Sequence, residues 1–181
     1  MKTLYSFLAL LITTIVLSQD LSLYDLTVEN KKDPVGIDNK QPRLSWKLKT
    51  DRKNVLQTNY HVQVATSKSF DENSMVWGSG KIESGQSSYV RYEGSQKSGT
   101  RYFWRVKVWD NQGKESDWSS PAFWETGFLD LEDWKAKWIE PQQKEAPSGP
   151  GLLTRKEFNI TKTVTKARVY ATAHGLYELH L

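Results

Sequence analysis

Cysteine is absent from this 181-residue chain, and methionine and proline are scarce, with two and six residues. Without cysteine no disulfide bond can form, and the lipid-bearing cysteine of a bacterial lipoprotein is excluded. A long basic run is also missing, because 25 lysines and arginines are interspersed with 21 aspartates and glutamates, for a net charge of +4. The sequence therefore does not favour nucleic acid as a partner.

Long apolar runs are missing as well, apart from one at the N-terminus. Lys2 precedes an apolar stretch at 4–17, and the small residue Ser18 then precedes Gln19. This pattern predicts a secretory signal peptide over 1–18, and hence a secreted or periplasmic protein with no membrane attachment after cleavage. An uncleaved membrane anchor is the alternative, although the run is shorter than the about 20 residues that a span needs.

Helical periodicity is also lacking in the remainder of the chain, whereas period-two alternation is common. The clearest example spans 99–110. Its predicted inward face holds Tyr102, Trp104, Val106 and Val108, and its outward face holds Phe103, Arg105, Lys107 and Trp109. We expect Tyr102, near the start of this strand, to form a tyrosine corner, in which the hydroxyl bonds to upstream backbone.

Six further segments show short strand patterns, separated by turn signals at regular spacing. They are 21–28, 44–48, 57–65, 76–77, 88–92 and 121–126, and 30–42 is predicted to be a loop. Short strands in this number, without a helix, are typical of an antiparallel β-sandwich of about 100 residues, which we place at 19–127. Its expected core comprises Trp46, Tyr60, Val62, Val64, Trp104, Val106 and Val108.

The pattern changes twice after this sandwich. Residues 128–151 form a predicted connector and linker, in which Trp134 and Trp138 are expected to dock on neighbouring surface. Residues 152–181 resume the β pattern. The strands expected there are 152–160, 167–173 and one from 176 onward. Three short strands rarely bury enough surface to be stable alone, so we expect 152–181 to be the truncated start of a second β-sandwich domain.

Candidate catalytic and metal-binding residues are few. Asp130, Glu132 and Asp133 form the densest acidic cluster, but they lie in the polar connector, whereas a catalytic acid needs a pocket that raises its pKa. A solvated loop is therefore the favoured interpretation. The histidines, which show no metal-ligand spacing and are expected at the surface, are His61, His174 and His180. The sequence thus predicts no catalytic, cofactor-binding or metal-binding residue in this chain.

Aromatic side chains outside the expected core are the remaining candidates for binding. They are Phe103, Trp109, Trp118, Trp124, Trp134 and Trp138. Aromatic rings suit the apolar faces of pyranoses, so a sugar-stacking platform is one interpretation. Packing of this module against neighbouring domains is the other, and it is the interpretation that we favour.

The order of several motifs resembles that of a known family. The motifs are Pro-Arg-Leu-Ser-Trp at 42–46, Tyr-Phe-Trp-Arg-Val at 102–106, Ser-x-Trp-Ser at 116–119, Phe-x-Glu-Thr-Gly at 123–127 and Trp-x-Ala-x-Trp-Ile at 134–139. Trp46 and the strand from Tyr102 resemble the core of a fibronectin type III-like (immunoglobulin-like) domain, and the whole series resembles the N-terminus of bacterial α-L-rhamnosidases. Residues 153–158 and 170–179 resemble the start of that family's second domain, a jelly-roll-like β-sandwich.

This resemblance implies a secreted glycoside hydrolase that removes terminal α-L-rhamnose from rhamnose-containing glycans or glycosides by inverting hydrolysis, without a cofactor. Inversion needs two carboxyl groups about 6.5–9.5 Å apart, and the family carries them on an (α/α)6 barrel that would lie downstream of this sequence. The chain would then be a non-catalytic N-terminal part that packs on downstream domains and is inactive alone. The alternative is a fibronectin-like carbohydrate- or protein-binding (adhesion) module with no hydrolase attached.

Overall fold

The computed structural model describes residues 21–139 and 153–180, and the chain divides into two units between Ala136 and Lys137. The predicted signal peptide at 1–18 and residues 140–151 of the predicted connector and linker lie outside the described residues. Each unit is described by itself. Among the described residues, no helix has the length and apolar character needed to cross a membrane.

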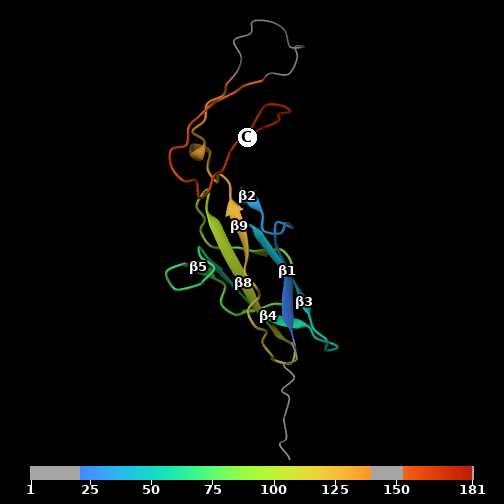
Figure 1. Cartoon of the computed structure of the whole chain (residues 1–181). Coiled ribbons are helices and arrows are strands. Elements are labelled where there is room, and N and C mark those ends of the chain that lie inside the picture. The colour runs from blue at the N-terminus through green and yellow to red at the C-terminus, as the bar shows by residue number, and fades with distance from the viewer. Residues whose placement is uncertain (1–20, 140–152, 181) are drawn as a thin grey trace, which may run out of the picture. The chain divides into compact units, whose positions relative to one another are not determined.

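The described part of the first unit contains nine strands in two sheets (Figure 1). The three-stranded sheet has the order β1 (Ser22–Val28), β3 (Arg43–Lys49), β7 (Val90–Arg91). The six-stranded sheet has the order β2 (Val35–Ile37), β9 (Ala122–Thr126), β8 (Arg101–Asp110), β4 (Gln57–Ala65), β5 (Met75–Gly78), and β6 (Ile82–Glu83) also pairs with β4. Each predicted strand before residue 127 coincides with or overlaps one of these strands, and the predicted all-β sandwich is confirmed.

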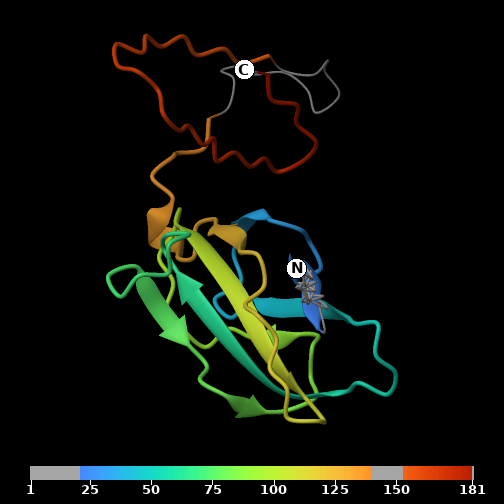
Figure 2. The ribbon, with the colours of Figure 1, turned by 60° about the horizontal axis from the view of Figure 1, so that its bottom comes forward.

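Strands β4 and β8 lie side by side in the middle of the six-stranded sheet (Figure 2). Along β8, buried residues alternate with half-buried ones, because successive side chains of a strand point to opposite faces. The buried hydrophobic residues of the two strands are Tyr60, Val62, Val64, Ala65, Tyr102, Trp104, Val106 and Val108. Together with Trp46, which is 2% exposed, they include the whole core that the sequence predicts.

Tyr102 forms the predicted tyrosine corner. The backbone N–H of Lys97 donates a hydrogen bond of 2.8 Å to the Tyr102 hydroxyl. This bond ties the segment before β8 to the core, because the Tyr102 ring is itself 3% exposed.

Trp124 belongs to the core, and the prediction that it is one of the outward aromatics is wrong. It pairs with Tyr102 across β8 and β9, faces inward and is 0% exposed. Its ring lies 5.3 Å from the rings of both Tyr92 and Tyr102, and its Nε1 donates to the Gln96 side-chain oxygen at 2.8 Å. The sequence alone does not show which of the adjacent aromatics Phe123 and Trp124 points inward, because this strand is short.

Strand β2 lies within 30–42, which the sequence predicts to be a loop. It pairs in parallel with β9, and the N–H of Glu125 donates to the Pro34 carbonyl at 2.9 Å. Three residues are too few to show a periodic pattern. Gly36 has a φ of +82°, which suits glycine and is typical of turns rather than strands. Pairing with β9, rather than local sequence, therefore makes this segment a strand.

The second unit has no strand among residues 153–180, although the sequence predicts three there. Its side chains are exposed, and Leu153 and Leu176 are fully so. Alternation can favour a strand only where a second strand satisfies its backbone groups. The residues described in this unit supply no such partner, so the alternating pattern alone does not produce a sheet.

Candidate functional site

The outward face of the six-stranded sheet combines cationic and aromatic side chains. Half of these side chains are the outward residues of β8. The rest come from β9 and from the turns after β4, β5 and β8. We call this surface the cation–aromatic face, and its members are Lys68, Phe70, Lys81, Arg101, Phe103, Arg105, Lys107, Trp109, Trp118 and Phe123.

Arg105 occupies the middle of this face. Its guanidinium carbon lies 4.3 Å from the centre of the Phe70 ring and 4.6 Å from that of Trp118. Its Nε and Nη2 both donate to the side-chain oxygen of Gln63, at 3.0 and 2.8 Å. Among the described residues no carboxylate pairs with it. The rings and one amide therefore stabilise a half-buried cation whose charge is not neutralised, and burial lowers the pKa of Arg105.

Other cations cover other rings of the cation–aromatic face. Arg101 lies over Phe123 at 4.2 Å, and Lys81 lies over Trp109 at 4.3 Å. Each of these rings therefore has one flat side occupied by a side chain of the chain itself. A sugar ring needs that flat side for stacking, so the arrangement disfavours the sugar-stacking interpretation for Trp109.

Positive charge exceeds negative charge on this face. Glu115 pairs with Lys107 at 3.2 Å, and the buried Glu125 pairs with Arg101 at 3.1 Å. Two of the five cations of the face are thus paired with carboxylates, and the other three are in no ion pair among the described residues. The positive charges of the face also affect the nearby His61. Its pKa is lowered by burial and then by the charges of Lys107 and Arg105.

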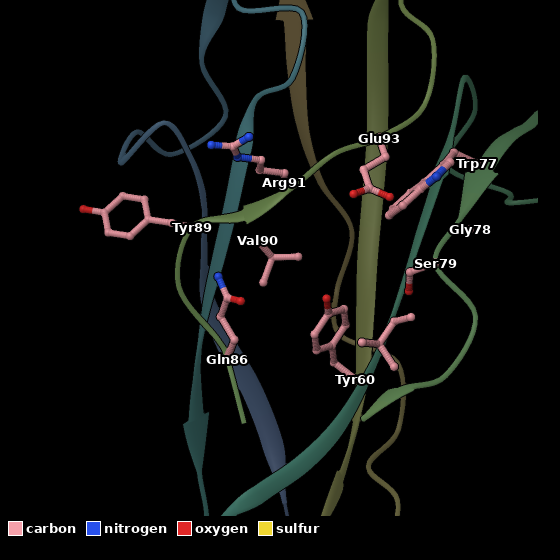
Figure 3. A pocket seen from close by; sticks show the side chains of 10 residues that line it. Tyr60, Trp77, Gly78, Ser79, Gln86, Tyr89, Val90, Arg91 and Glu93 are labelled. Carbon is pink, nitrogen blue, oxygen red and sulfur yellow. The ribbon is translucent and has the colours of Figure 1, made fainter. Parts of the chain in front are cut away.

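A groove of about 540 Å³ opens between the edges of the two sheets (Figure 3). It lies where β5 ends the six-stranded sheet and β7 ends the three-stranded sheet, with β6 beside it. We call it the sheet-edge groove, and its lining residues are Tyr60, Trp77, Gly78, Ser79, Ile82, Gln86, Tyr89, Val90, Arg91 and Glu93. The sequence does not predict this groove. Its walls come from four separate segments, and only the order of the strands in the sheets brings these segments together.

The predicted acidic cluster lies at a short 3₁₀ helix, η1 (Leu131–Asp133). Asp130 pairs with Lys40 at 2.6 Å, and Asp133 accepts a hydrogen bond from the Ser98 hydroxyl. The Ser98 hydrogen bond holds the pKa of Asp133 below its usual value, opposite to the shift that a general acid needs. These carboxylates fix the end of the sandwich to the connector, and Glu132 is exposed.

One histidine and one connector tryptophan come together, because the ring of His174 stacks on that of Trp138 at 4.1 Å between ring centres. His61 lies against Trp118 at 5.1 Å between ring centres, and His180 pairs with Glu178 at 3.3 Å. Across the two described stretches, no three His, Cys, Asp or Glu side chains gather as metal ligands. Trp134 packs edge-on against Phe128, another residue of the predicted connector, at 5.0 Å between ring centres.

The fold and both surfaces lie within a single family match. The sequence model of the Rha78A-like, N-terminal immunoglobulin domain matches residues 23–130, from β1 to the connector. The chain belongs to this family. The resemblance that the sequence motifs indicate is thereby confirmed for the sandwich.

Several relatives of this Rha78A-like immunoglobulin domain are α-L-rhamnosidases. A Formosa agariphila α-L-rhamnosidase is 35% identical over 175 residues, which cover 83% of this chain and 18% of that protein. The crystal structure of Streptomyces avermitilis α-L-rhamnosidase complexed with L-rhamnose is 42% identical, with a TM-score of 0.63, over 66% of this chain and 12% of that chain. The structure of α-L-rhamnosidase from Dictyoglumus thermophilum is 39% identical, with a TM-score of 0.65, over 70% of this chain and 14% of that chain. The chain therefore spans less than a fifth of the length of each of these proteins.

Proposed function

We propose that this chain is the non-catalytic N-terminal part of a secreted glycoside hydrolase, an α-L-rhamnosidase, that removes terminal α-L-rhamnose from glycans or glycosides by inverting hydrolysis. The observation that carries the proposal is the match of residues 23–130, which include β2 to β9 and nearly all of β1, to the N-terminal immunoglobulin domain of Rha78A-like proteins. The relatives' names supply the activity and the substrate class. A free-standing adhesion module is not favoured, because the relatives that match this domain are long hydrolases.

The described residues support a non-catalytic role. Inverting hydrolysis needs an acid and a base on opposite sides of the sugar. The sheet-edge groove is lined by one carboxylate, that of Glu93, and the acidic cluster near η1 is used in structural bonds. We therefore propose that the catalytic carboxylates lie in another part of a longer polypeptide, and that the apolar run at 4–17 directs its export as a signal peptide.

The activity proposal is tested with an aryl α-L-rhamnoside. The chain alone is expected to release no aryl alcohol above the buffer rate, whereas the longer polypeptide that contains it should turn the substrate over with inversion of the product anomer. An aryl β-D-glucoside serves as the matched control substrate. Turnover by the chain alone, or a longer polypeptide without rhamnosidase activity, contradicts the proposal.

We propose further that the cation–aromatic face packs on another domain of that longer polypeptide, through an acidic patch of the partner domain. Surplus positive charge supports this proposal, since Arg105, Lys68 and Lys81 have no carboxylate partner among the described residues. Half-buried rings between the cations add apolar area to such an interface.

Charge reversal tests this interface. In the longer polypeptide, the double variant Lys68→Glu and Lys81→Glu is expected to lower the Tm of unfolding by at least about 2 °C, because surface ion pairs contribute up to about 1 kcal/mol each. The loss should shrink in about 0.5 M salt. The control variant Lys49→Glu and Lys53→Glu, at the end of β3 and in the loop after it, should leave the Tm unchanged. An equal loss of Tm in the chain alone would show that the lysines act within this domain instead.

A further inference from the structure

Tyr60 presents its hydroxyl to the sheet-edge groove. The residue is 9% exposed, and its ring packs edge-on against Trp46 at 5.4 Å. Within the stretches that the structure describes, no group forms a hydrogen bond with its hydroxyl, which points into the groove (Figure 3). A tyrosine hydroxyl can both donate and accept a hydrogen bond. The groove therefore exposes a polar group that a ligand can satisfy.

Glu93 supplies a second polar group on the same groove. Its carboxylate points into the space beside Trp77 (Figure 3), and no cation or hydrogen-bond donor of the described chain pairs with it. Burial, and then the negative charge of Glu93, raise the pKa of Tyr60, which agrees with the closeness of the two groups. A carboxylate accepts hydrogen bonds strongly, and sugar hydroxyls are donors.

Trp77 gives the groove its aromatic wall. It is half-buried, and edge-on packing against Tyr92 at 5.2 Å holds its orientation. In contrast to Trp109 and Trp118 on the cation–aromatic face, Trp77 has no cation over its ring among the contacts of the described residues. Val90 and Ile82 continue the apolar lining.

The charges of the groove select a neutral ligand. Glu93 contributes one negative charge and Arg91 one positive charge, and the other lining residues are uncharged. An anion would meet the Glu93 carboxylate beside the ring, and the Arg91 guanidinium offsets the attraction for a cation. A neutral molecule with several hydroxyl groups and one apolar face satisfies all the groups present. A volume of about 540 Å³ is enough for one such small ligand.

We propose that the sheet-edge groove is a binding site for a neutral pyranoside. The sugar's apolar face lies against Trp77, and its hydroxyls donate to the Glu93 carboxylate and bond with the Tyr60 hydroxyl. The choice of a rhamnoside as the first probe rests on the proposed function, whereas the neutral, hydroxyl-rich character of the ligand follows from the groove itself.

The test is a titration of the ¹⁵N-labelled chain with methyl α-L-rhamnoside, methyl α-D-mannoside and methyl α-D-glucoside, following the Trp77 indole N–H signal. At least one pyranoside is expected to shift this signal saturably, with a Kd in the millimolar range. Tyr60→Phe and Glu93→Gln should each weaken binding about tenfold while retaining the side chain's shape. The first removes a hydrogen bond to the ligand, and the second removes the charge that strengthens one. The exposed controls Tyr24→Phe and Glu72→Gln should bind as the unchanged chain does.

Two results would overturn the site. One is the lack of a saturable shift with any of the three pyranosides up to about 50 mM. The other is binding that neither Tyr60→Phe nor Glu93→Gln weakens, in variants whose spectra show an intact fold. Failure of the site leaves the rhamnosidase proposal standing if the longer polypeptide still releases rhamnose. Binding of the glucoside but not the rhamnoside supports the site and leaves rhamnosidase activity to its own assay.

Discussion

Replacing Trp124 by alanine is expected to lower the free energy of unfolding by about 3–5 kcal/mol, measured by urea denaturation followed by far-ultraviolet circular dichroism. The ring is fully buried and contacts Tyr92 and Tyr102, so truncation leaves a cavity between the sheets. A loss of this size is a large part of the stability of a small domain. The exposed Trp138→Ala serves as the control and should change the free energy by no more than about 0.5 kcal/mol.

Tryptophan-to-phenylalanine variants test the same core more finely. The Nε1 of Trp124 donates to Gln96, whereas the Nε1 of Trp104 is buried without a hydrogen-bond partner. Trp124→Phe leaves the Gln96 oxygen without its donor, but Trp104→Phe removes a donor that is already unsatisfied. Trp104→Phe should therefore cost about 1 kcal/mol less than Trp124→Phe. The reverse order would contradict this account of the two indoles.

Replacing Asp110 by alanine is expected to cost about 3 kcal/mol of unfolding free energy. The Asp110 side chain is fully buried at the end of β8 and pairs with Arg52. Its Oδ1 also accepts the backbone N–H groups of Gln112 and Lys114, both at 2.9 Å. Truncation leaves the Arg52 cation and the turn amides without their shared acceptor. The exposed Asp38→Ala is the control and should be close to neutral.

The Asp110 pair also predicts a pH dependence. Burial opposes ionisation of Asp110, but the hydrogen bonds from Arg52, Lys114 and Gln112 outweigh it and hold its pKa below the usual 3.8. The ionised form is therefore favoured in the folded state. Its contribution to stability is complete above the unfolded pKa and is lost as the pH falls through the lower folded value.

Urea denaturation at a series of pH values checks this dependence. Asp110→Asn retains the side-chain oxygen but not the charge, so its stability should fall less steeply below about pH 4 than that of the unchanged chain. Parallel curves for the two proteins would show that the Asp110 charge does not contribute to acid unfolding.

The sequence by itself determined the central strand and its two faces. Alternation from 99 to 110 separates Tyr102, Trp104, Val106 and Val108 from the outward residues, because adjacent side chains of a strand point in opposite directions. The structure buries all four, and the tyrosine corner forms with Lys97. Motif order also determined the family, which the match over 23–130 confirms.

Only the tertiary structure decided the rest of the sheet. Strand β2 exists through its pairing with β9, and Trp124 faces inward because of its register opposite Tyr102. Conversely, 153–180 alternates as a strand does yet forms none in the described residues. Backbone hydrogen bonding between strands is a non-local property, so local alternation predicts which face a side chain takes but not whether a partner strand is present.

The two surfaces show the same division. The outward residues of β8 can be predicted from the sequence. The side chains that they contact come partly from separate turns, so only the folded chain places Arg105 between Phe70 and Trp118. The sheet-edge groove has no sequence signal at all, since Tyr60, Trp77 and Glu93 lie in different segments. Local physics thus determined the sandwich and its family, whereas the sheet order, which brings distant residues together, decided where this domain offers binding surfaces.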